Sequence, residues 1–243
     1  MNTSLGLLGR GRLGQAIRAA AASTADLEVP WAVGREGPAD AAPVDVAVDV
    51  STAAAVPAHL EWAARTGTPL VIGTTGWDPH LLDGDPPVPV LVAPNFSLGA
   101  ALVRRLSRVL GGYAAQAPVA VDLAVTETHH RHKVDAPSGT ALALREALAR
   151  GAGRRLEEVQ TTSLRVGQVV GDHEVVVASE LETITLRHSA HSRDLFAAGA
   201  LTAARWLLSR PAPGLFTLDD LAEDHLRTLL GAPSIPHPTL SEA

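Results

Sequence analysis

The sequence predicts an α/β protein of two domains, in which a doubly wound parallel sheet is joined to a second α+β domain with a mixed, mainly antiparallel sheet. Three observations support this prediction. A glycine-rich turn directly follows the first apolar strand, and apolar strands then alternate with helices. After Gly112 the hydrophobic pattern changes to alternation in period two. With 243 residues the chain has room for one or two domains.

The first part of the chain is a succession of strands and helices. Residues 4–23 contain an apolar strand, a glycine turn and an alanine-rich helix. Residues 44–50, VDVAVDV, are apolar on both faces, as a buried parallel strand should be. Further strands are expected at 27–33, 69–73 and 89–94, and helices at 56–66 and 98–110. This alternation predicts an open parallel sheet with helices on both faces.

The second part contains strands that alternate in period two. They are expected at 119–125, 161–171, 173–179 and 182–189, with a tight turn at Gly171 and Asp172. A helix at 193–210 crosses back, and Thr217 caps a last helix that carries aspartates in its first turn. We therefore expect one domain at 1–96 that is completed by 213–243, and a second domain at 97–212.

Composition excludes several classes of protein. The net charge is -6, which argues against a protein that mainly binds nucleic acid, because such proteins usually carry a basic face. The absence of cysteine excludes disulfides, thiolate metal sites and a cysteine nucleophile. No apolar run reaches the roughly 18 residues of a membrane span, and arginines come too early for a signal peptide. We expect a cytoplasmic protein that does not bind a membrane.

The glycine turn has the spacing of a dinucleotide-binding loop. Gly9, Gly11 and Gly14 form G-x-G-x-x-G between the first strand and its helix. Glycines at this spacing permit a tight turn and a close approach to a pyrophosphate, which the helix N-terminus attracts. Arg10 and Arg12 add positive charge within the loop. The sequence thus predicts a Rossmann-like domain that binds a dinucleotide.

The end of the second strand bears on the choice of dinucleotide. A carboxylate at this point normally binds the adenosine ribose of NAD, but here Gly34 and Arg35 precede Glu36. An arginine at this place can receive a 2′-phosphate, so we expect NADPH to be preferred and NADH to be the alternative cofactor. Two later loops, Gly73 to Trp77 and Ala93 to Ser97, also follow strands and can line the same crevice.

The segment from His129 to Thr140, HHRHKVDAPSGT, concentrates the titratable groups of the chain. It contains Lys133, the only lysine among 20 basic residues. Arginine stays protonated near neutral pH whereas lysine can release its proton, so Lys133 is a candidate for proton transfer. The Pro-Ser-Gly-Thr turn that follows precedes a helix, which Ser138 or Thr140 can cap.

Three kinds of ligand are conceivable for this cluster: a metal ion, a nucleic acid and a small carboxylate. Zinc usually takes three converging ligands, and the sequence has no helical H-x-x-x-H. Nucleic acid needs a wider basic surface with stacking aromatics, yet aromatics make up 3% of the chain. A small carboxylate fits better, since peptide N–H groups of a helix N-terminus lie on one side and cations on the other. A histidine beside a lysine can also deliver a proton. We expect no metal and no nucleic acid.

At this point the chain resembles a known family. The segment ETHHRHKVDAPSGTAL, residues 127–142, is similar to the signature of the dihydrodipicolinate reductases, bacterial enzymes of the diaminopimelate route to lysine. The resemblance extends over nearly the whole chain, through VIGTTGW, APNFSLGA, VGQVVGDHEV and HSAHSRDLFAAGAL. It departs from the family at Gly34, where an acidic residue is usual, and in a glycine loop that is one residue shorter than in many members.

The resemblance implies a two-domain enzyme that reduces dihydrodipicolinate, formed from 4-hydroxy-tetrahydrodipicolinate, to tetrahydrodipicolinate with NADPH or NADH. It implies a dinucleotide-binding first domain and a second domain for substrate binding and oligomerisation, typically in a homotetramer. By motif match, His129 is a proton donor or acceptor and Lys133 a second donor, while the substrate dicarboxylate is held by His130, Gly139 and Thr140. The residues expected to bind the cofactor are Gly9, Arg10, Gly11, Arg12, Leu13, Arg35, Gly73, Thr74, Thr75, Ala93, Pro94, Asn95 and Phe96.

Two alternatives stay open on the sequence. One is a two-domain NAD(P)H reductase of another small dicarboxylate or imine. The other is a dinucleotide-binding protein without catalytic activity. The complete histidine–lysine motif argues against the first. Degradation of the catalytic loop would favour the second, but this loop is intact.

Overall fold

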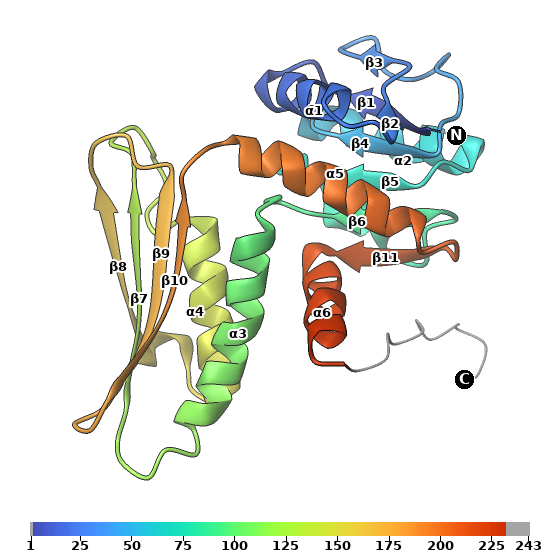
Figure 1. Ribbon diagram of the computed structural model, residues 1–243. Helices are drawn as coiled ribbons and strands as arrows, with labels where there is room; N and C mark the ends of the chain where they lie inside the picture. Colours follow the sequence, from blue (N-terminus) through green and yellow to red (C-terminus); the bar gives the residue numbers. More distant parts are fainter. Residues whose placement is uncertain (1, 232–243) are drawn as a thin grey trace.

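The computed structural model describes residues 2–231 and contains two sheets (Figure 1). The larger sheet has seven strands in the order β11-β6-β5-β4-β1-β2, and β3 pairs with β1 beyond β2. All of its pairs are parallel. Its strands are β1 (Thr3–Leu8), β2 (Leu27–Glu28), β3 (Ala32–Val33), β4 (Val46–Asp49), β5 (Leu70–Ile72), β6 (Pro89–Val92) and β11 (Gly214–Thr217).

Helices cover both faces of this sheet, as expected for parallel strands. The alternation of side chains along β4 divides the core: Val46 and Val48 face one layer of helices, and Ala47 faces the other. The first layer contains α1 (Arg12–Ala22) and α5 (Asp194–Leu208), and the second contains α2 (Val56–Thr66) with the buried Trp62. The predicted doubly wound parallel sheet is confirmed.

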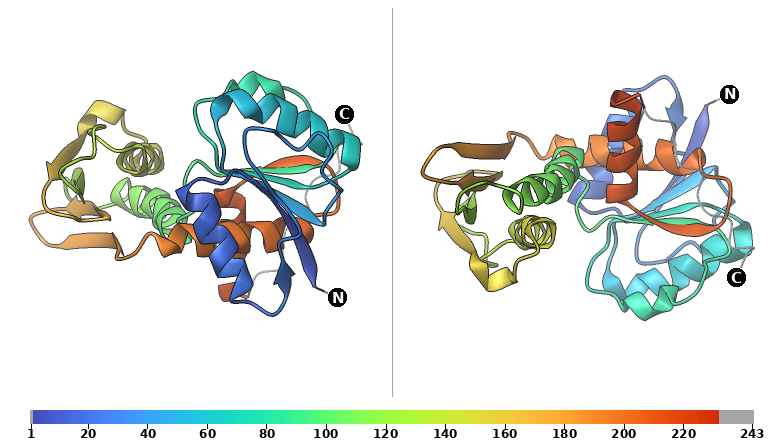
Figure 2. Two further views of the ribbon diagram at one scale, coloured as in Figure 1. Left: turned by 90° about the horizontal axis from the view of Figure 1, so that it is seen from above. Right: turned by 90° about the horizontal axis from the view of Figure 1, so that it is seen from below.

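The second sheet has four strands in the order β10-β9-β7-β8, in which β7 and β8 are parallel and the other pairs are antiparallel. Helices α3 and α4 cover one face, and no element of residues 2–231 covers the other (Figures 1 and 2). The mixed, mainly antiparallel sheet is thus also confirmed. The elements of this part are α3 (Leu98–Ala114), β7 (Asp122–His129), α4 (Gly139–Ala152), β8 (Val159–Arg165), β9 (Gly171–Ala178) and β10 (Thr183–Ala190).

Two predicted details were wrong. The strand expected at 27–33 is broken into β2 and β3. Pro30 lies between them, where the sheet requires no hydrogen bond from its missing N–H. The tight turn expected at Gly171 and Asp172 lies instead at residues 167–168, where Gly167 adopts a φ of +57°. Gly171 and Asp172 belong to β9 and pair with Ala190 and Ser189 of β10.

The chain passes between the two parts twice. It leaves the first sheet after β6, and it returns through α5, whose residues Ala197, Ala200 and Ala204 are buried in the core of the first sheet. The last helix, α6 (Leu218–Leu229), begins at a capping box in which Thr217 and Asp220 bond to each other's backbone, as the sequence predicts. The domain division at 96/97 and 212/213 stays a proposal, and residues 232–243 of its last segment lie outside the described part.

Three shorter 3₁₀ helices complete the described chain, at Ala53–Ala55, Pro79–Leu82 and Leu156–Glu158. Among the helices within residues 2–231, none combines the length and the apolar character that crossing a membrane requires.

Candidate functional site

The glycine loop after β1 is shaped by close backbone packing. Gly9 has a φ of +124°, and a Cβ there would lie 2.5 Å from the Val50 carbonyl oxygen. A Cβ on Gly14 would lie 2.1 Å from the Gly9 carbonyl oxygen, so α1 packs directly on the loop. At Gly11, by contrast, a Cβ would meet nothing within 4 Å. Gly9 and Gly14 are therefore required by backbone packing, whereas Gly11 leaves open space at the N-terminus of α1.

This open space suits a diphosphate. Gly11 is the N-cap of α1, no side chain caps the helix, and its first turn has no acidic residue. The first N–H groups of the helix are thus directed at the space that Gly11 leaves, beside the exposed side chains of Arg10 and Arg12. The residues present fit the pyrophosphate of a dinucleotide, while Leu13 is partly buried against the core.

The other predicted cofactor loops lie at the same edge, because parallel strands end on the same side of a sheet. The loops after β5 and β6 touch: a Cβ on Gly73 would lie 2.3 Å from the Phe96 ring. Ala93 and Phe96 are 1% and 2% exposed, so their side chains belong to the core and only their backbone can meet a ligand. Thr75 and Pro94 are exposed, and Asn95 is half-buried.

A buried network that sequence reasoning missed holds these loops. Asp49, at the end of β4, accepts hydrogen bonds from the hydroxyls of Ser51 at 2.6 Å and Thr74 at 2.8 Å. Its other oxygen lies 2.8 Å from Nδ1 of His59 on α2, and both side chains are almost fully buried. The Thr74 hydroxyl is therefore engaged inside the protein. An acid at the end of an otherwise apolar strand was the available signal.

The structure corrects the prediction for the strand end that would bind the adenosine ribose of the cofactor. The Glu36 carboxylate folds back over the end of β3, where Oε1 accepts the Gly34 N–H at 2.9 Å and lies 2.9 Å from the Arg10 guanidinium. The Gly34 N–H, with Arg10, holds the pKa of Glu36 below its ordinary value. A carboxylate therefore does lie at this strand end. The expectation that none would lie there, because Gly34 stands at the usual position of the acid, was wrong. Arg35 is exposed, and its side chain forms no hydrogen bond or ion pair with any residue from 2 to 231.

The histidine cluster lies at the end of β7, around a buried carboxylate. Glu127 has a fully buried side chain, and its Oε1 accepts from the Ser138 N–H at 2.9 Å, the Ser163 hydroxyl at 2.7 Å and the Arg165 guanidinium at 2.8 Å. Its Oε2 lies 3.0 Å from Nδ1 of His129. Burial raises the pKa of Glu127, but the donors from Ser138, Arg165 and Ser163 outweigh it and lower that pKa to about 2.

His129 is itself 7% exposed and packs edge to face on His173, with ring centroids 5.0 Å apart. Burial lowers the pKa of His129, and the positive charges of Lys133 and Arg165 lower it further, although Glu127 opposes them. Burial, followed by the charge of His129, lowers the pKa of His173 to about 4. Both rings are therefore mainly neutral near pH 7.

Lys133 and His130 follow in the loop after β7. The Lys133 ammonium lies 2.7 Å from Oδ1 and 2.9 Å from Oδ2 of Asp135, and its side chain is 23% exposed. His130 Nε2 lies 3.5 Å from the guanidinium of Arg193, which comes from the connection between β10 and α5. Arg193 is thus a cation at the edge of the predicted carboxylate site that sequence reasoning missed.

The N-terminus of α4 completes the site. Ser138 caps the helix by accepting the Ala141 N–H at 3.2 Å, which resolves the choice between Ser138 and Thr140. A Cβ on Gly139 would meet nothing within 4 Å, so this helix also begins at open space. Asn95, from the loop after β6, donates a hydrogen bond of 3.1 Å to the Thr140 hydroxyl. A predicted cofactor loop and a predicted substrate residue are therefore in direct contact.

The cluster contains residue types that can hold a metal ion. Glu127, His129 and His173 offer ligand atoms within 4.8 Å of one another. However, one oxygen of Glu127 already carries three donors, one of them the Arg165 guanidinium, and the Lys133 ammonium is near. These cations oppose a further positive charge in a buried space. The absence of a metal stays a prediction.

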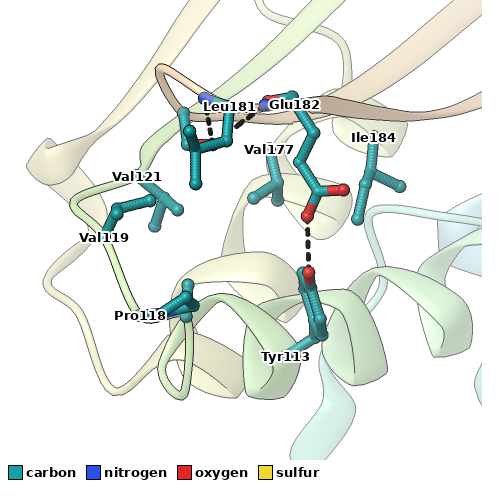
Figure 3. A pocket seen from close by; sticks show the side chains of 10 residues that line it. Tyr113, Pro118, Val119, Val121, Val177, Leu181, Glu182 and Ile184 are labelled. Atoms are coloured by element: carbon teal, nitrogen blue, oxygen red, sulfur yellow. Dashed lines mark hydrogen bonds between the residues drawn. The ribbon is translucent and has the colours of Figure 1, made fainter.

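Sequence reasoning missed Glu127, Arg165 and His173 as members of this cluster. Period-two alternation was the available signal, because Glu127 and His129 share the buried face of β7, and His173 shares that of β9. A separate hollow of about 240 Å³ lies at the other end of this domain, between Tyr113, Leu181 and Ile184 (Figure 3). Its lining is mainly apolar, and the polar side chains of Tyr113, Glu182 and Ser179 are hydrogen-bonded within the lining.

Known proteins with similar sequences agree on one family. Family models described as "Dihydrodipicolinate reductase, N-terminus" and "Dihydrodipicolinate reductase, C-terminus" match residues 3–96 and 98–222. The 4-hydroxy-tetrahydrodipicolinate reductase of Zymomonas mobilis is 40% identical, with 90% of this chain and 97% of the relative covered. That of Gluconobacter oxydans is 44% identical over 72% of this chain and 76% of the relative.

A solved structure shows the same fold. The dipicolinate-bound dihydrodipicolinate reductase of Paenisporosarcina sp. TG-14 matches with a TM-score of 0.73 at 21% identity, with 89% of this chain and 98% of that chain covered. The two family models together extend over both sheets. The chain therefore belongs to the dihydrodipicolinate reductase family.

Proposed function

We propose that this protein is an oxidoreductase that reduces dihydrodipicolinate, formed from 4-hydroxy-tetrahydrodipicolinate, to tetrahydrodipicolinate with NADPH or NADH, in the diaminopimelate route to lysine. Family membership supports the reaction. The main structural support is the Asn95–Thr140 hydrogen bond. It connects the sheet edge that suits a dinucleotide to the N-terminus of α4, which suits a carboxylate. A hydride donor and its acceptor need such direct proximity.

The residues of the second domain bind the substrate in this proposal. The N–H groups at the start of α4, at Gly139 and Thr140, donate to one carboxylate, since the helix N-terminus attracts an anion. His130 and Arg193, whose side chains lie 3.5 Å apart, bind carboxylate oxygens in this proposal. Two anionic groups on a small ring match this arrangement of peptide donors and cations.

The residues of the first domain bind the cofactor. The backbone at Gly9, Arg10, Gly11, Arg12 and Leu13 surrounds the pyrophosphate, and Gly73, Thr74, Thr75 and residues 93–96 border the nicotinamide. A bound reduced nicotinamide supplies the hydride. Arg35 favours NADPH by pairing with a 2′-phosphate, whereas Glu36 accepts from a ribose hydroxyl and keeps NADH usable.

The proton comes from Lys133 and His129 together. The pKa of His129 lies below its ordinary value of 6.5, so this imidazole is mainly neutral at pH 7. Lys133 therefore holds the proton that quenches the negative charge left on the reduced ring, and Asp135 fixes the direction of its ammonium group. In this proposal the unprotonated nitrogen of His129 accepts that proton from Lys133 and passes it to the reduced ring, so that one proton is consumed for each hydride.

Assembly and location are part of the same proposal. The outer face of the second sheet is uncovered, and the half-exposed Val176 and Ala178 lie on it. Burying this face between copies of the chain would yield the homotetramer that is typical of the family. Light scattering tests this, with four times the chain mass as the expected result and a monomer as the contradicting one. A cytoplasmic location rests on the family's biosynthetic role.

The reaction is tested by following the absorbance of NADPH and of NADH while 4-hydroxy-tetrahydrodipicolinate is generated enzymatically in the same cuvette. Oxidation that requires the precursor and rises with protein concentration is the expected result. Omission of the precursor and the His129→Gln variant serve as controls. Tight cofactor binding without any precursor-dependent oxidation would contradict the proposal and favour a non-catalytic dinucleotide-binding protein.

A further inference from the structure

The two oxygens of Glu127 have different surroundings. Oε1 is held by three donors from two separate elements: the Ser138 N–H at the N-cap of α4, and the side chains of Ser163 and Arg165 on β8. Oε2 accepts none of these bonds and faces the imidazoles of His129 at 3.0 Å and His173 at 3.9 Å. One oxygen thus anchors the carboxylate, and the other is directed at the candidate proton-transfer residue.

We propose that Glu127 is a positioning residue that keeps a hydrogen on Nδ1 of His129 and thereby leaves Nε2 as the nitrogen that exchanges a proton at the substrate. The inference rests on the function proposed above, because it gives His129 a role in turnover. It follows from geometry: Nδ1 of His129 and Oε2 of Glu127 are both buried, neither has another hydrogen-bond partner among residues 2–231, and the two atoms lie 3.0 Å apart, within hydrogen-bond distance. A carboxylate accepts hydrogen bonds and cannot donate them while ionised.

The ionisation state of Glu127 agrees with this role. Its pKa of about 2 leaves it charged at any pH at which the protein would be assayed. A neutral imidazole beside a fixed negative charge is more stable with its N–H directed at that charge. The charged and titratable groups that face His129 are Glu127 on β7, Lys133 and Asp135 in the following loop, Arg165 on β8 and His173 on β9.

His173 restricts the orientation of the His129 ring. It packs edge to face against that ring, while its own Nε2 lies 3.3 Å from the Ser138 hydroxyl. Gly171 leaves room on the other side, since a Cβ there would lie 3.0 Å from Nε2 of His129. The ring is thus held between the start of β9 and the Glu127 carboxylate, and a rotation would separate Nδ1 from Oε2.

The Glu127→Gln substitution tests the inference sharply. Three donors require an acceptor at the Oε1 position, so the amide oxygen should occupy it and the amide NH₂ should take the place of Oε2. An NH₂ group donates to Nδ1, which moves the ring hydrogen to Nε2. The expected tautomer of His129 is therefore inverted by replacing one atom.

The tautomer is read by ¹⁵N NMR of histidine-labelled protein without substrate, with His129 assigned from the spectrum of His129→Gln. We expect Nδ1–H in the parent and Nε2–H in Glu127→Gln at pH 7.5. Turnover should fall by about 10- to 10³-fold, and KM should stay within about threefold of the parent value. This loss is smaller than the roughly 10⁴-fold loss that a wrong histidine tautomer causes in a serine-protease triad. The matched control is Glu146→Gln on α4, whose carboxylate is exposed and pairs with Arg150; both readouts should match the parent.

Removing a buried charge can unfold the protein, because Arg165 would lose its carboxylate partner. If circular dichroism shows that Glu127→Gln is unfolded, the double variant with Arg165→Met removes both charges and retains the serine donors. An unchanged His129 tautomer in the folded variant would overturn the inference. An inverted tautomer with normal turnover would also overturn it, and in that case precursor-dependent oxidation by the parent would show that the proposed reaction itself stands.

Discussion

The dinucleotide edge and the Glu127 cluster present their polar groups by different means. At the edge, the donors are backbone N–H groups of α1, and the charged side chains nearby are exposed: Arg10 is 60% and Glu36 53% exposed. In the cluster, most donors and acceptors are side chains, apart from the Ser138 N–H, and the side chains of Glu127 and His129 are 0% and 9% exposed. A site built from backbone depends on steric space, whereas one built from buried titratable groups depends on protonation.

This difference decides how each region should respond to change. Peptide N–H groups do not titrate, so the edge should bind its ligand across a wide range of pH and tolerate loss of single charges. Buried imidazoles and carboxylates change their charge state with large energetic consequences. The cluster should therefore account for most of the pH dependence of the protein.

The largest effect is expected at Lys133. The Lys133→Arg variant keeps the charge beside Asp135 but stays protonated at accessible pH. If Lys133 releases a proton, kcat should fall by roughly 10²–10⁴ and KM should change by no more than a few-fold. Steady-state kinetics with NADPH decides it. A loss confined to KM would show that Lys133 only anchors a carboxylate.

Acid stability comes next. The pKa of Glu127 is about 2 against an ordinary 4.5, so its stabilisation is present above pH 4.5 and is lost as the pH falls towards 2. The pKa of His173 is about 4 against 6.5, so its stabilisation is complete above pH 6.5 and is lost between 6.5 and 4. Each contribution is at most about 3 kcal/mol.

Urea unfolding at pH 7.5, 5.5 and 4 measures this loss. Between pH 6.5 and 4 the parent should lose more unfolding free energy than His173→Gln, which has no group to protonate in that range. Equal losses of unfolding free energy in the two proteins would show that His173 does not cause the loss of stability between pH 6.5 and 4.

Two substitutions in the glycine loop should separate an effect on folding from an effect on cofactor binding. Gly14→Ala places a methyl group against the Gly9 carbonyl and should lower the unfolding free energy by about 1–3 kcal/mol. Gly11→Ala meets no atom, so the melting temperature should stay unchanged while NADPH binding weakens about tenfold. Thermal melts and fluorescence titrations separate the two. Equal cofactor affinity in Gly11→Ala and the parent would show that the pyrophosphate lies elsewhere.

The smallest effect is expected at the exposed charges. Arg35→Ala should weaken NADPH binding by about fivefold and leave NADH binding unchanged, because the side chain is exposed and screened. Glu36→Gln should shift the ratio the other way, since it removes a negative charge near the 2′-phosphate and an acceptor for the ribose. Titration of both variants with both cofactors checks this. The same ratio in parent and both variants would remove these residues from cofactor selection.

The comparison also explains what could be read from the sequence. The glycine loop, the Thr217 cap and the His129–Lys133 segment are local patterns, because their geometry depends on a few neighbouring residues. The family was predicted correctly from such motifs, and the fold class from the alternation of strands and helices and the later period-two pattern. The roles of the individual site residues stay predictions.

Contacts between distant segments could not be read in this way. Arg165 and His173 join Glu127 only through the pairing of β7 with β8 and β9. The register of a sheet determines such contacts, and no single segment encodes it. Glu36 was visible in the sequence, but its return to the Gly34 N–H depends on a side-chain conformation that spacing does not specify.

The most direct test of the account measures both regions in a single variant. In His129→Gln, the NADPH dissociation constant and kcat should be determined on the same preparation, by fluorescence titration and by precursor-dependent oxidation. We expect a dissociation constant within about twofold of the parent and a kcat at least about tenfold lower, since the proposed proton-transfer site consists of side chains and the proposed cofactor site of backbone. A normal kcat, or a loss of NADPH affinity as large as the loss of turnover, would overturn the assignment of proton transfer to the Glu127 cluster and of cofactor binding to the glycine loop.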